Sequence, residues 1–158
     1  MPNRLPHIRL LAHNVRSLWN VGSFFRTCDA LNVERLYLTG YTGHPPRKEI
    51  SKTALYAEEW IEWEHAEHPF PILLSLREEG WELVALELTE DAQDIATFLS
   101  SHDKVCLIVG NELEGVTHDL LSLCDHTVCI PMLGRKESLN VAVAAGIALH
   151  TLRNVRRN

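Results

Sequence analysis

Short apolar runs alternate with helix-like segments along most of this 158-residue chain, and that order constrains the fold more than any other feature. The runs expected to form strands are residues 8–12, 35–39, 60–63, 83–88, 105–109 and 127–130. The segments expected to form helices are residues 21–31, 51–59, 69–79 and 138–150. Short runs with little polar face are typical of strands buried on both sides, and a βαβ order favours a parallel sheet. We therefore predict an α/β fold, with a mostly parallel sheet that carries helices on both faces.

The size and composition predict a single domain over residues 1–158, because 46% hydrophobic residues suffice for one real core. No stretch reaches the roughly 18 consecutive apolar residues of a membrane span, and the N-terminus lacks the apolar run of a secretory signal. We expect a cytoplasmic protein without a membrane partner. The four cysteines form no CxxC motif, which favours reduced core thiols and no metal site; they are Cys28, Cys106, Cys124 and Cys129.

The net charge of −6 counts against a generic nucleic-acid binder, since neutralising phosphates requires a basic surface. A local basic patch is still compatible with this balance. The basic side chains that could form one are Arg4, Arg9, Arg16, Arg26, Arg47, Lys48, Lys52, Arg135, Lys136, Arg153, Arg156 and Arg157. Ordinary surface charge explains the same residues, and composition alone favours that explanation.

Three loops at predicted strand ends are candidate ligand sites, because parallel sheets bind ligands at the carboxyl ends of their strands. The first loop leads into NxGxxxR, with Asn20 and Arg26, where the arginine is either a surface residue or a functional one. The second, GNELEG at residues 110–115, is unlike a phosphate-binding loop because Glu112 and Glu114 replace the required lysine. These acids favour a cationic or hydroxyl-bearing ligand.

The third loop, residues 129–140, leads into a final helix that is apolar around most of its circumference. Ser138 could cap this helix or offer its hydroxyl to a ligand. Leu139, Val143 and Ile147 would lie on one side of the helix, with other apolar residues opposite. A central core helix of a monomer and a helix packed against a second subunit both explain this pattern.

Taken in order, NxGxxxR, GNExEG and IPMxG…SLNVAVAAGIAL resemble the three motifs of the SpoU-type (TrmH-like) branch of the SPOUT RNA methyltransferases. The resemblance spans residues 14–152, and residues 44–65 are similar to a further segment of short family members. It implies a C-terminal deep trefoil knot, with the knot and the cofactor region at about residues 105–155. It also implies S-adenosylmethionine as cofactor, RNA as substrate and a homodimer built on the last helix.

The same resemblance implies the site residues. The positions implied to bind the cofactor, mainly through main-chain groups, are Leu86, Gly110, Ile130, Ser138 and Leu139. The positions implied to be catalytic are Asn20, Arg26, Glu112 and Asn140. Asn20 would orient Arg26 or the ribose, Glu112 would hold Arg26 or the cofactor's amino group, and Asn140 would fix the third loop.

The reaction that the resemblance implies moves a methyl group from the sulfonium of S-adenosylmethionine to a ribose 2′-hydroxyl. Because arginine stays protonated in proteins, we expect Arg26 to stabilise the developing alkoxide rather than act as a base. The short layout favours tRNA as substrate, with rRNA as the alternative, and few terminal residues are available to grip RNA. A non-catalytic knotted module that binds RNA or S-adenosylmethionine is a further alternative. A flavodoxin-like domain would need a phosphate loop or paired acids after the first strand, and the sequence has neither there.

Overall fold

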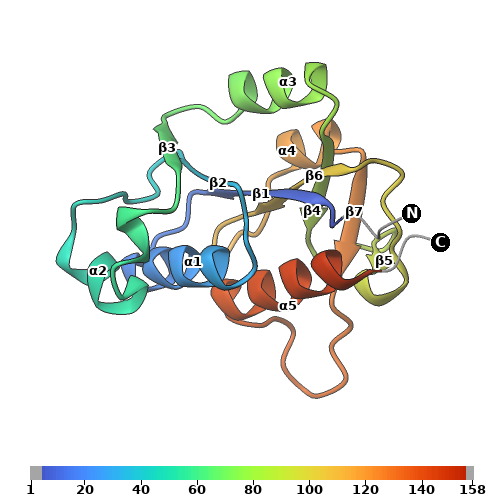
Figure 1. Ribbon diagram of the computed structural model, residues 1–158. Coiled ribbons are helices and arrows are strands. Elements are labelled where there is room, and N and C mark those ends of the chain that lie inside the picture. The colour runs from blue at the N-terminus through green and yellow to red at the C-terminus, as the bar shows by residue number, and fades with distance from the viewer. Residues whose placement is uncertain (1–4, 156–158) are drawn as a thin grey trace.

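A seven-stranded sheet in the order β3-β2-β1-β6-β4-β7-β5 organises the computed structural model, which describes residues 5–155 (Figure 1). The strands are β1 (His7–His13), β2 (Arg35–Thr39), β3 (Trp63–Ala66), β4 (Glu82–Leu86), β5 (Gln93–Asp94), β6 (Lys104–Val109) and β7 (His126–Cys129). Every pairing between these named strands is parallel. The predicted α/β fold with a mostly parallel sheet is therefore confirmed.

Helices cover both faces of the sheet, as predicted. They are α1 (Leu18–Ala30), α2 (Lys48–Ala54), α3 (Phe70–Glu78), α4 (His118–Leu123) and α5 (Val141–Asn154), with short 3-10 turns η1 (Ala57–Glu59) and η2 (Ile95–Thr97). Figure 1 shows α1 and α5 side by side on one face, with α3 and α4 on the other. Phe24, Phe25 and Leu149 belong to the apolar layer under α1 and α5, whereas Leu73 and Leu120 belong to the opposite layer.

The segment between β2 and β3 differs from the prediction. The helix expected over 51–59 ends at Ala54, because Leu55 and Tyr56 both take left-handed backbone angles, with φ of 49° and 73°. The strand expected over 60–63 begins only at Trp63. Before it, the Trp60 indole donates to Asp29 Oδ1 at 2.7 Å, so this part of the chain packs on α1 instead of joining the sheet.

Burial keeps the cysteine thiols protonated. Cys28, Cys106 and Cys129 are buried and Cys124 is partly buried, all as free thiols. Burial raises the pKa of the Cys124 thiol to about 12, and it raises the pKa of the other three as well. Within residues 5–155, no helix has the length and apolar character needed to cross a membrane, and no group of side chains is arranged to hold a metal ion.

Gly22 sets the distance between α1 and α2. A Cβ placed on it would lie 1.9 Å from Thr53 Oγ1 and 2.3 Å from the Ile50 carbonyl oxygen. These contacts are too short for any side chain, so the glycine of the first motif serves close helix packing.

We predict that Gly22→Ala lowers the free energy of unfolding by about 1–3 kcal/mol, because the added methyl group forces the two helices apart. Gly146→Ala is the matched control, since its Cβ would meet only Thr27 Cγ2 at 3.8 Å. Gly146→Ala should leave the free energy of unfolding unchanged or raise it by up to about 1 kcal/mol, because alanine has a higher helix propensity than glycine. Urea titrations at one chain concentration measure both, and equal midpoints for Gly22→Ala and the unmutated chain would contradict the packing role.

Candidate functional site

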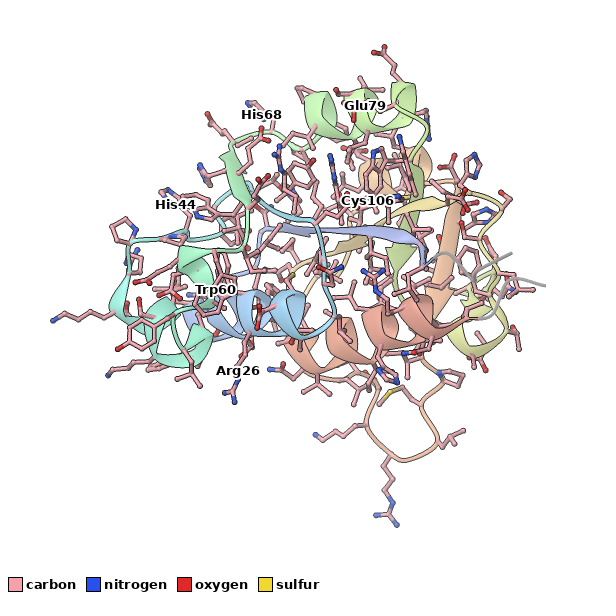
Figure 2. The ribbon with its side chains drawn as sticks, in the orientation of Figure 1. Arg26, His44, Trp60, His68, Glu79 and Cys106 are labelled. Atoms are coloured by element: carbon pink, nitrogen blue, oxygen red, sulfur yellow. The ribbon has the colours of Figure 1, made fainter. Side chains whose placement is uncertain are left out.

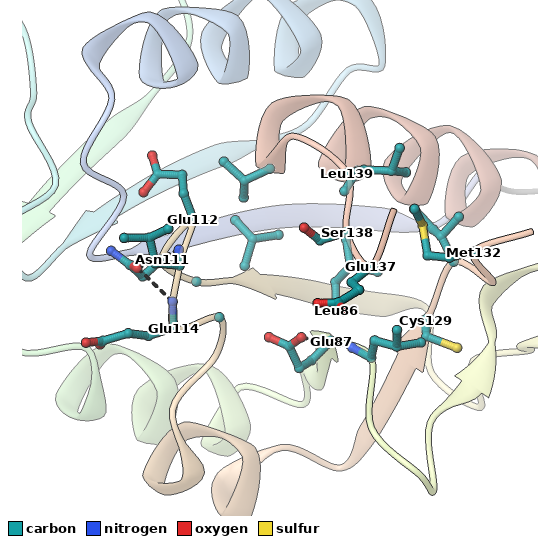
Figure 3. A pocket seen from close by; sticks show the side chains of 18 residues that line it. Leu86, Glu87, Asn111, Glu112, Glu114, Cys129, Met132, Glu137, Ser138 and Leu139 are labelled. Atoms are coloured by element: carbon teal, nitrogen blue, oxygen red, sulfur yellow. Dashed lines mark hydrogen bonds between the residues drawn. The ribbon is translucent and has the colours of Figure 1, made fainter. Parts of the chain in front are cut away.

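A cavity of about 290 Å³ lies at the carboxyl ends of β4, β6 and β7, near the lower end of the range for small-molecule sites (Figure 3). Its walls come from residues 86–88 at the end of β4, residues 109–115 at the end of β6, and Val141 and Ala144 of α5. The segment between β7 and α5 contributes Cys129, Ile130, Met132, Glu137, Ser138 and Leu139. The residues that the sequence predicted to bind a cofactor all line this cavity; they are Leu86, Gly110, Ile130, Ser138 and Leu139. The rule for strand ends thus locates the cavity from the sequence.

Three of the four predicted catalytic residues form one hydrogen-bonded chain beside the cavity. Glu112 Oε1 accepts from Asn20 Nδ2 at 3.2 Å, and Asn140 Nδ2 donates to Asn20 Oδ1 at 3.1 Å. We call this the Glu112–Asn20–Asn140 chain. Asn20 is only 8% exposed, so its amide depends on these partners. The chain joins the second, first and third loops, which are far apart in sequence.

The Glu112 carboxylate also accepts hydrogen bonds from the backbone N–H groups of Arg16 and Ser17, each at 3.0 Å, at the N-terminus of α1. Burial of the carboxyl group opposes its ionisation. The N–H donors of Ser17 and Arg16, together with the amide of Asn20, outweigh that effect and lower the pKa of Glu112. Glu112 is therefore ionised near neutral pH and fixes the start of α1 to the second loop.

Asn140 has a second role as the N-cap of α5. Its Oδ1 accepts from the backbone N–H groups of Ala142 at 2.9 Å and Val143 at 3.2 Å. The helix therefore begins at Val141 and not at Ser138, and the interpretation of Ser138 as the cap is wrong. The Ser138 hydroxyl makes no hydrogen bond within residues 5–155 and lies at the cavity wall (Figure 3).

Tight backbone contacts shape the second loop. A Cβ on Gly110 would lie 2.2 Å from the carbonyl oxygen of Gly115, which has a φ of 70°. Asn111 closes the turn, because its Oδ1 accepts from the backbone N–H groups of Leu113 and Glu114 at 2.8 and 2.9 Å. Sequence reasoning did not select Asn111, although an asparagine in a glycine-bounded turn is the available signal for such a role.

The cavity wall is acidic. It carries four glutamates, Glu87, Glu112, Glu114 and Glu137, and its lining has no lysine or arginine. Glu87 accepts from the backbone N–H groups of Leu88 and Val116 at 2.9 and 2.8 Å, and Glu112 is held at the N-terminus of α1. The carboxylates of Glu114 and Glu137 form no hydrogen bond or ion pair within residues 5–155. The cavity therefore favours a ligand with positive charge and an apolar part, which Leu86 and Ile130 would contact.

Arg26, the fourth predicted catalytic residue, lies outside this arrangement. It is exposed on α1, its side chain points outward in Figure 2, and it does not line the cavity. It forms no hydrogen bond or ion pair within the described part of the chain. Glu112 and Asn20, which could have held Arg26, bond instead to each other.

The candidate basic residues near the two ends of the chain divide into two groups. Arg153 donates through Nε to the Leu31 carbonyl at 2.9 Å and through a terminal nitrogen to the Asn32 carbonyl at 2.7 Å. Arg153 therefore connects α5 to the segment that follows α1, and its guanidinium donors are used within the fold. Arg4, Arg156 and Arg157 lie outside the described residues.

The fold is that of a known family of proteins. Residues 7–150 match the SpoU rRNA Methylase family, and the chain belongs to that family. The resemblance drawn from the three motifs is thus confirmed.

Individual relatives match over nearly the whole chain. The chain is 31% identical over 157 residues to the tRNA (guanosine(18)-2′-O)-methyltransferase of Aquifex aeolicus, an alignment covering 99% of this chain and 73% of that protein. The crystal structure of the A. aeolicus TrmH/SpoU tRNA modifying enzyme superposes with a TM-score of 0.84 at 30% identity, covering 96% of this chain and 76% of that one. An AdoMet-bound rRNA methyltransferase from Sinorhizobium meliloti gives a TM-score of 0.87 at 28% identity, with coverage of 97% and 58%.

We predict that Asn140→Ala lowers the free energy of unfolding by about 1–2 kcal/mol, because it removes the cap of α5 and the donor to the amide oxygen of Asn20. Ser138→Ala, two residues earlier, is the matched control and should unfold like the unmutated chain, since its hydroxyl has no partner to lose. Chemical denaturation followed by circular dichroism measures the difference. Equal losses for the two variants would remove the capping role of Asn140.

Proposed function

We propose that this chain transfers a methyl group from S-adenosylmethionine to a ribose 2′-hydroxyl of tRNA. The observation that carries the proposal is the acidic cavity at the ends of β4, β6 and β7, which the second and third motifs line together with residues 86–88. The names of the A. aeolicus relative and of the AdoMet-bound S. meliloti structure support the substrate class and the cofactor.

The residues of the cavity fit S-adenosylmethionine. Apolar side chains of Leu86, Ile130 and Leu139 would enclose the adenine, while main-chain groups at Gly110 would pair with its edge. Glu137, which lines only this cavity, would balance the net positive charge of the ligand. When bound, the cofactor supplies a methyl group on a sulfonium, which is already a good electrophile.

The protein must therefore mainly position the ribose hydroxyl and favour loss of its proton. We assign Arg26 to this task, because a permanent positive charge stabilises a developing alkoxide. The Glu112–Asn20–Asn140 chain has a positioning role, since it fixes the three loops relative to one another. The side chains of Glu112, Asn20 and Asn140 are hydrogen-bonded to one another. Glu112 also accepts from the backbone N–H groups of Arg16 and Ser17.

A homodimer would reconcile the position of Arg26 with this task. Leu139, Val143 and Ile147 form an exposed apolar stripe at the start of α5, and Val143 is 52% exposed. Thr27, next to Arg26, lies against Gly146 of α5. Figure 2 shows Arg26 projecting outward from α1, on the side of the sheet that α1 and α5 cover. We propose that a second copy covers the stripe and that each subunit supplies Arg26 to the cavity of its partner.

We also propose that the C-terminal part is knotted and that residues 1–158 form one domain that works in the cytoplasm. After β7, residues 130–140 form a long loop that leads into α5 (Figure 1). Helix α5 then packs against both β6 and η2. Such packing supports threading of the chain within residues 105–155.

The assay that tests the reaction uses the full chain with S-adenosylmethionine labelled in its methyl group and with total tRNA or rRNA as acceptor. We expect label in tRNA, resistant to alkaline cleavage at the modified ribose. Label only in rRNA would replace the proposed substrate by the alternative. Calorimetric binding of the cofactor without transfer to either RNA would indicate a non-catalytic binding module and contradict the proposed activity.

The shared site predicts complementation between two inactive variants. Arg26→Ala removes the charge, whereas Ser138→Trp fills the cavity from an exposed position where folding should tolerate the change. Either variant alone should lose at least about 100-fold in methyl transfer, in line with the loss of an electrostatic catalytic group. Subunits mixed after mild denaturation should recover about a quarter of the unmutated rate, because half the dimers then carry one intact shared site.

Recovery would fail if Arg26 acted on the cavity of its own chain, because no subunit in the mixture would then hold both intact parts. Unchanged turnover in Arg26→Ala would remove its catalytic assignment altogether. Light scattering on each variant is the control that the dimer itself has formed.

A further inference from the structure

A second recess of about 480 Å³ adjoins the cavity on the other side of the second loop. It is lined by Arg16, Ser17, Tyr41 and residues 111–114, and this last segment also lines the first cavity. One turn of backbone thus separates the two spaces. A molecule in the second recess would lie next to a molecule in the first.

Tyr41 stands in this recess as a fixed but exposed aromatic ring. Its backbone N–H donates to Asn14 Oδ1 at 3.0 Å, and its hydroxyl accepts from Asn111 Nδ2 at 2.6 Å. Asn111 is itself held, since Nδ2 also donates to the Asn14 carbonyl at 3.0 Å. Nevertheless 60% of the Tyr41 side chain is exposed. A large side chain held at both ends and open to solvent is already ordered for a partner, so binding there costs little further conformational entropy.

The remaining groups of the recess complement a nucleotide. The backbone N–H of Arg16 is used by Glu112, but its guanidinium is exposed and forms no bond within residues 5–155, so it is available to a phosphate. Of the two carboxylates in the lining, Glu112 is already occupied, which leaves Glu114 to accept N–H donors from a base. An unpaired RNA base stacks well on an exposed aromatic ring.

We infer that this recess binds the RNA nucleoside whose ribose is methylated, with its base stacked on Tyr41 and an adjacent phosphate against Arg16. The inference rests on the proposed methyl transfer and adds the part of the enzyme that holds the target nucleotide. The shared turn at residues 111–114 would then place the ribose next to the methyl donor.

The test compares Tyr41→Ala, Tyr41→Phe and Tyr56→Ala. Tyr41→Phe keeps the ring and loses only the bond from Asn111, and Tyr56 is a similarly exposed tyrosine outside the recess. Equilibrium binding of tRNA to the full chain, saturated with S-adenosylhomocysteine, is followed by fluorescence anisotropy. Tyr41→Ala should weaken tRNA binding by about 10- to 100-fold, as expected for loss of one stacked base. Tyr41→Phe and Tyr56→Ala should stay within about threefold of the unmutated chain, because both keep the stacking ring of Tyr41.

Two control measurements separate the loss of base stacking from damage to the cofactor cavity or to subunit assembly. Calorimetry should give the same affinity for S-adenosylmethionine in all variants, and light scattering the same oligomeric state. Unchanged tRNA binding in Tyr41→Ala would overturn the inference, and so would a loss that accompanies a changed oligomeric state. Because the main measurement is binding, it still tests base stacking on Tyr41 if the unmutated chain transfers no methyl groups, an outcome that contradicts the proposed function.

Discussion

The Asn20 amide is the interaction on which the site depends. It is buried on α1 and satisfies both of its ends within one chain of bonds, by donating to Glu112 and by accepting from Asn140. A buried amide without partners costs about 1–3 kcal/mol, so the arrangement is stable only when all three loops are in place. The cofactor cavity and the start of α5 therefore form together, as one unit.

The hydrogen bonds of the polar side chains distinguish residues with a structural role from residues that are free to contact a substrate. Glu112 and Asn140 are committed to holding backbone N–H groups at the starts of α1 and α5, which leaves them little freedom to act on a substrate. Arg26 and Tyr41, by contrast, are exposed and outside the cavity wall. Within one chain, the cavity is therefore lined without Arg26 and Tyr41, the two residues that we propose act on RNA.

The sequence was sufficient for the features that depend on local pattern. Alternating apolar and helical segments predict the parallel sheet, and the rule for strand ends selects the loops that carry Gly110 and Ile130. It failed where tertiary contacts decide. Leu55 and Tyr56 take left-handed angles that no propensity predicts, and Trp60 bonds to Asp29 instead of extending β3. The cap of α5 falls to Asn140 rather than Ser138, and the partners of Glu112 come from a loop nearly a hundred residues earlier, which no local pattern reveals.

A double-mutant cycle on Asn20 and Asn140, measured as the affinity for S-adenosylmethionine by calorimetry, tests this account most directly. The capping loss of Asn140→Ala occurs in both halves of the cycle and cancels, so the cycle isolates the bond between the two side chains. We expect each single Ala variant to weaken binding and the double variant to be less impaired than the sum, with a coupling free energy of about 1 kcal/mol. Strictly additive effects, or a cofactor affinity that neither substitution changes, would contradict the claim that this bond aligns the loops of the cavity.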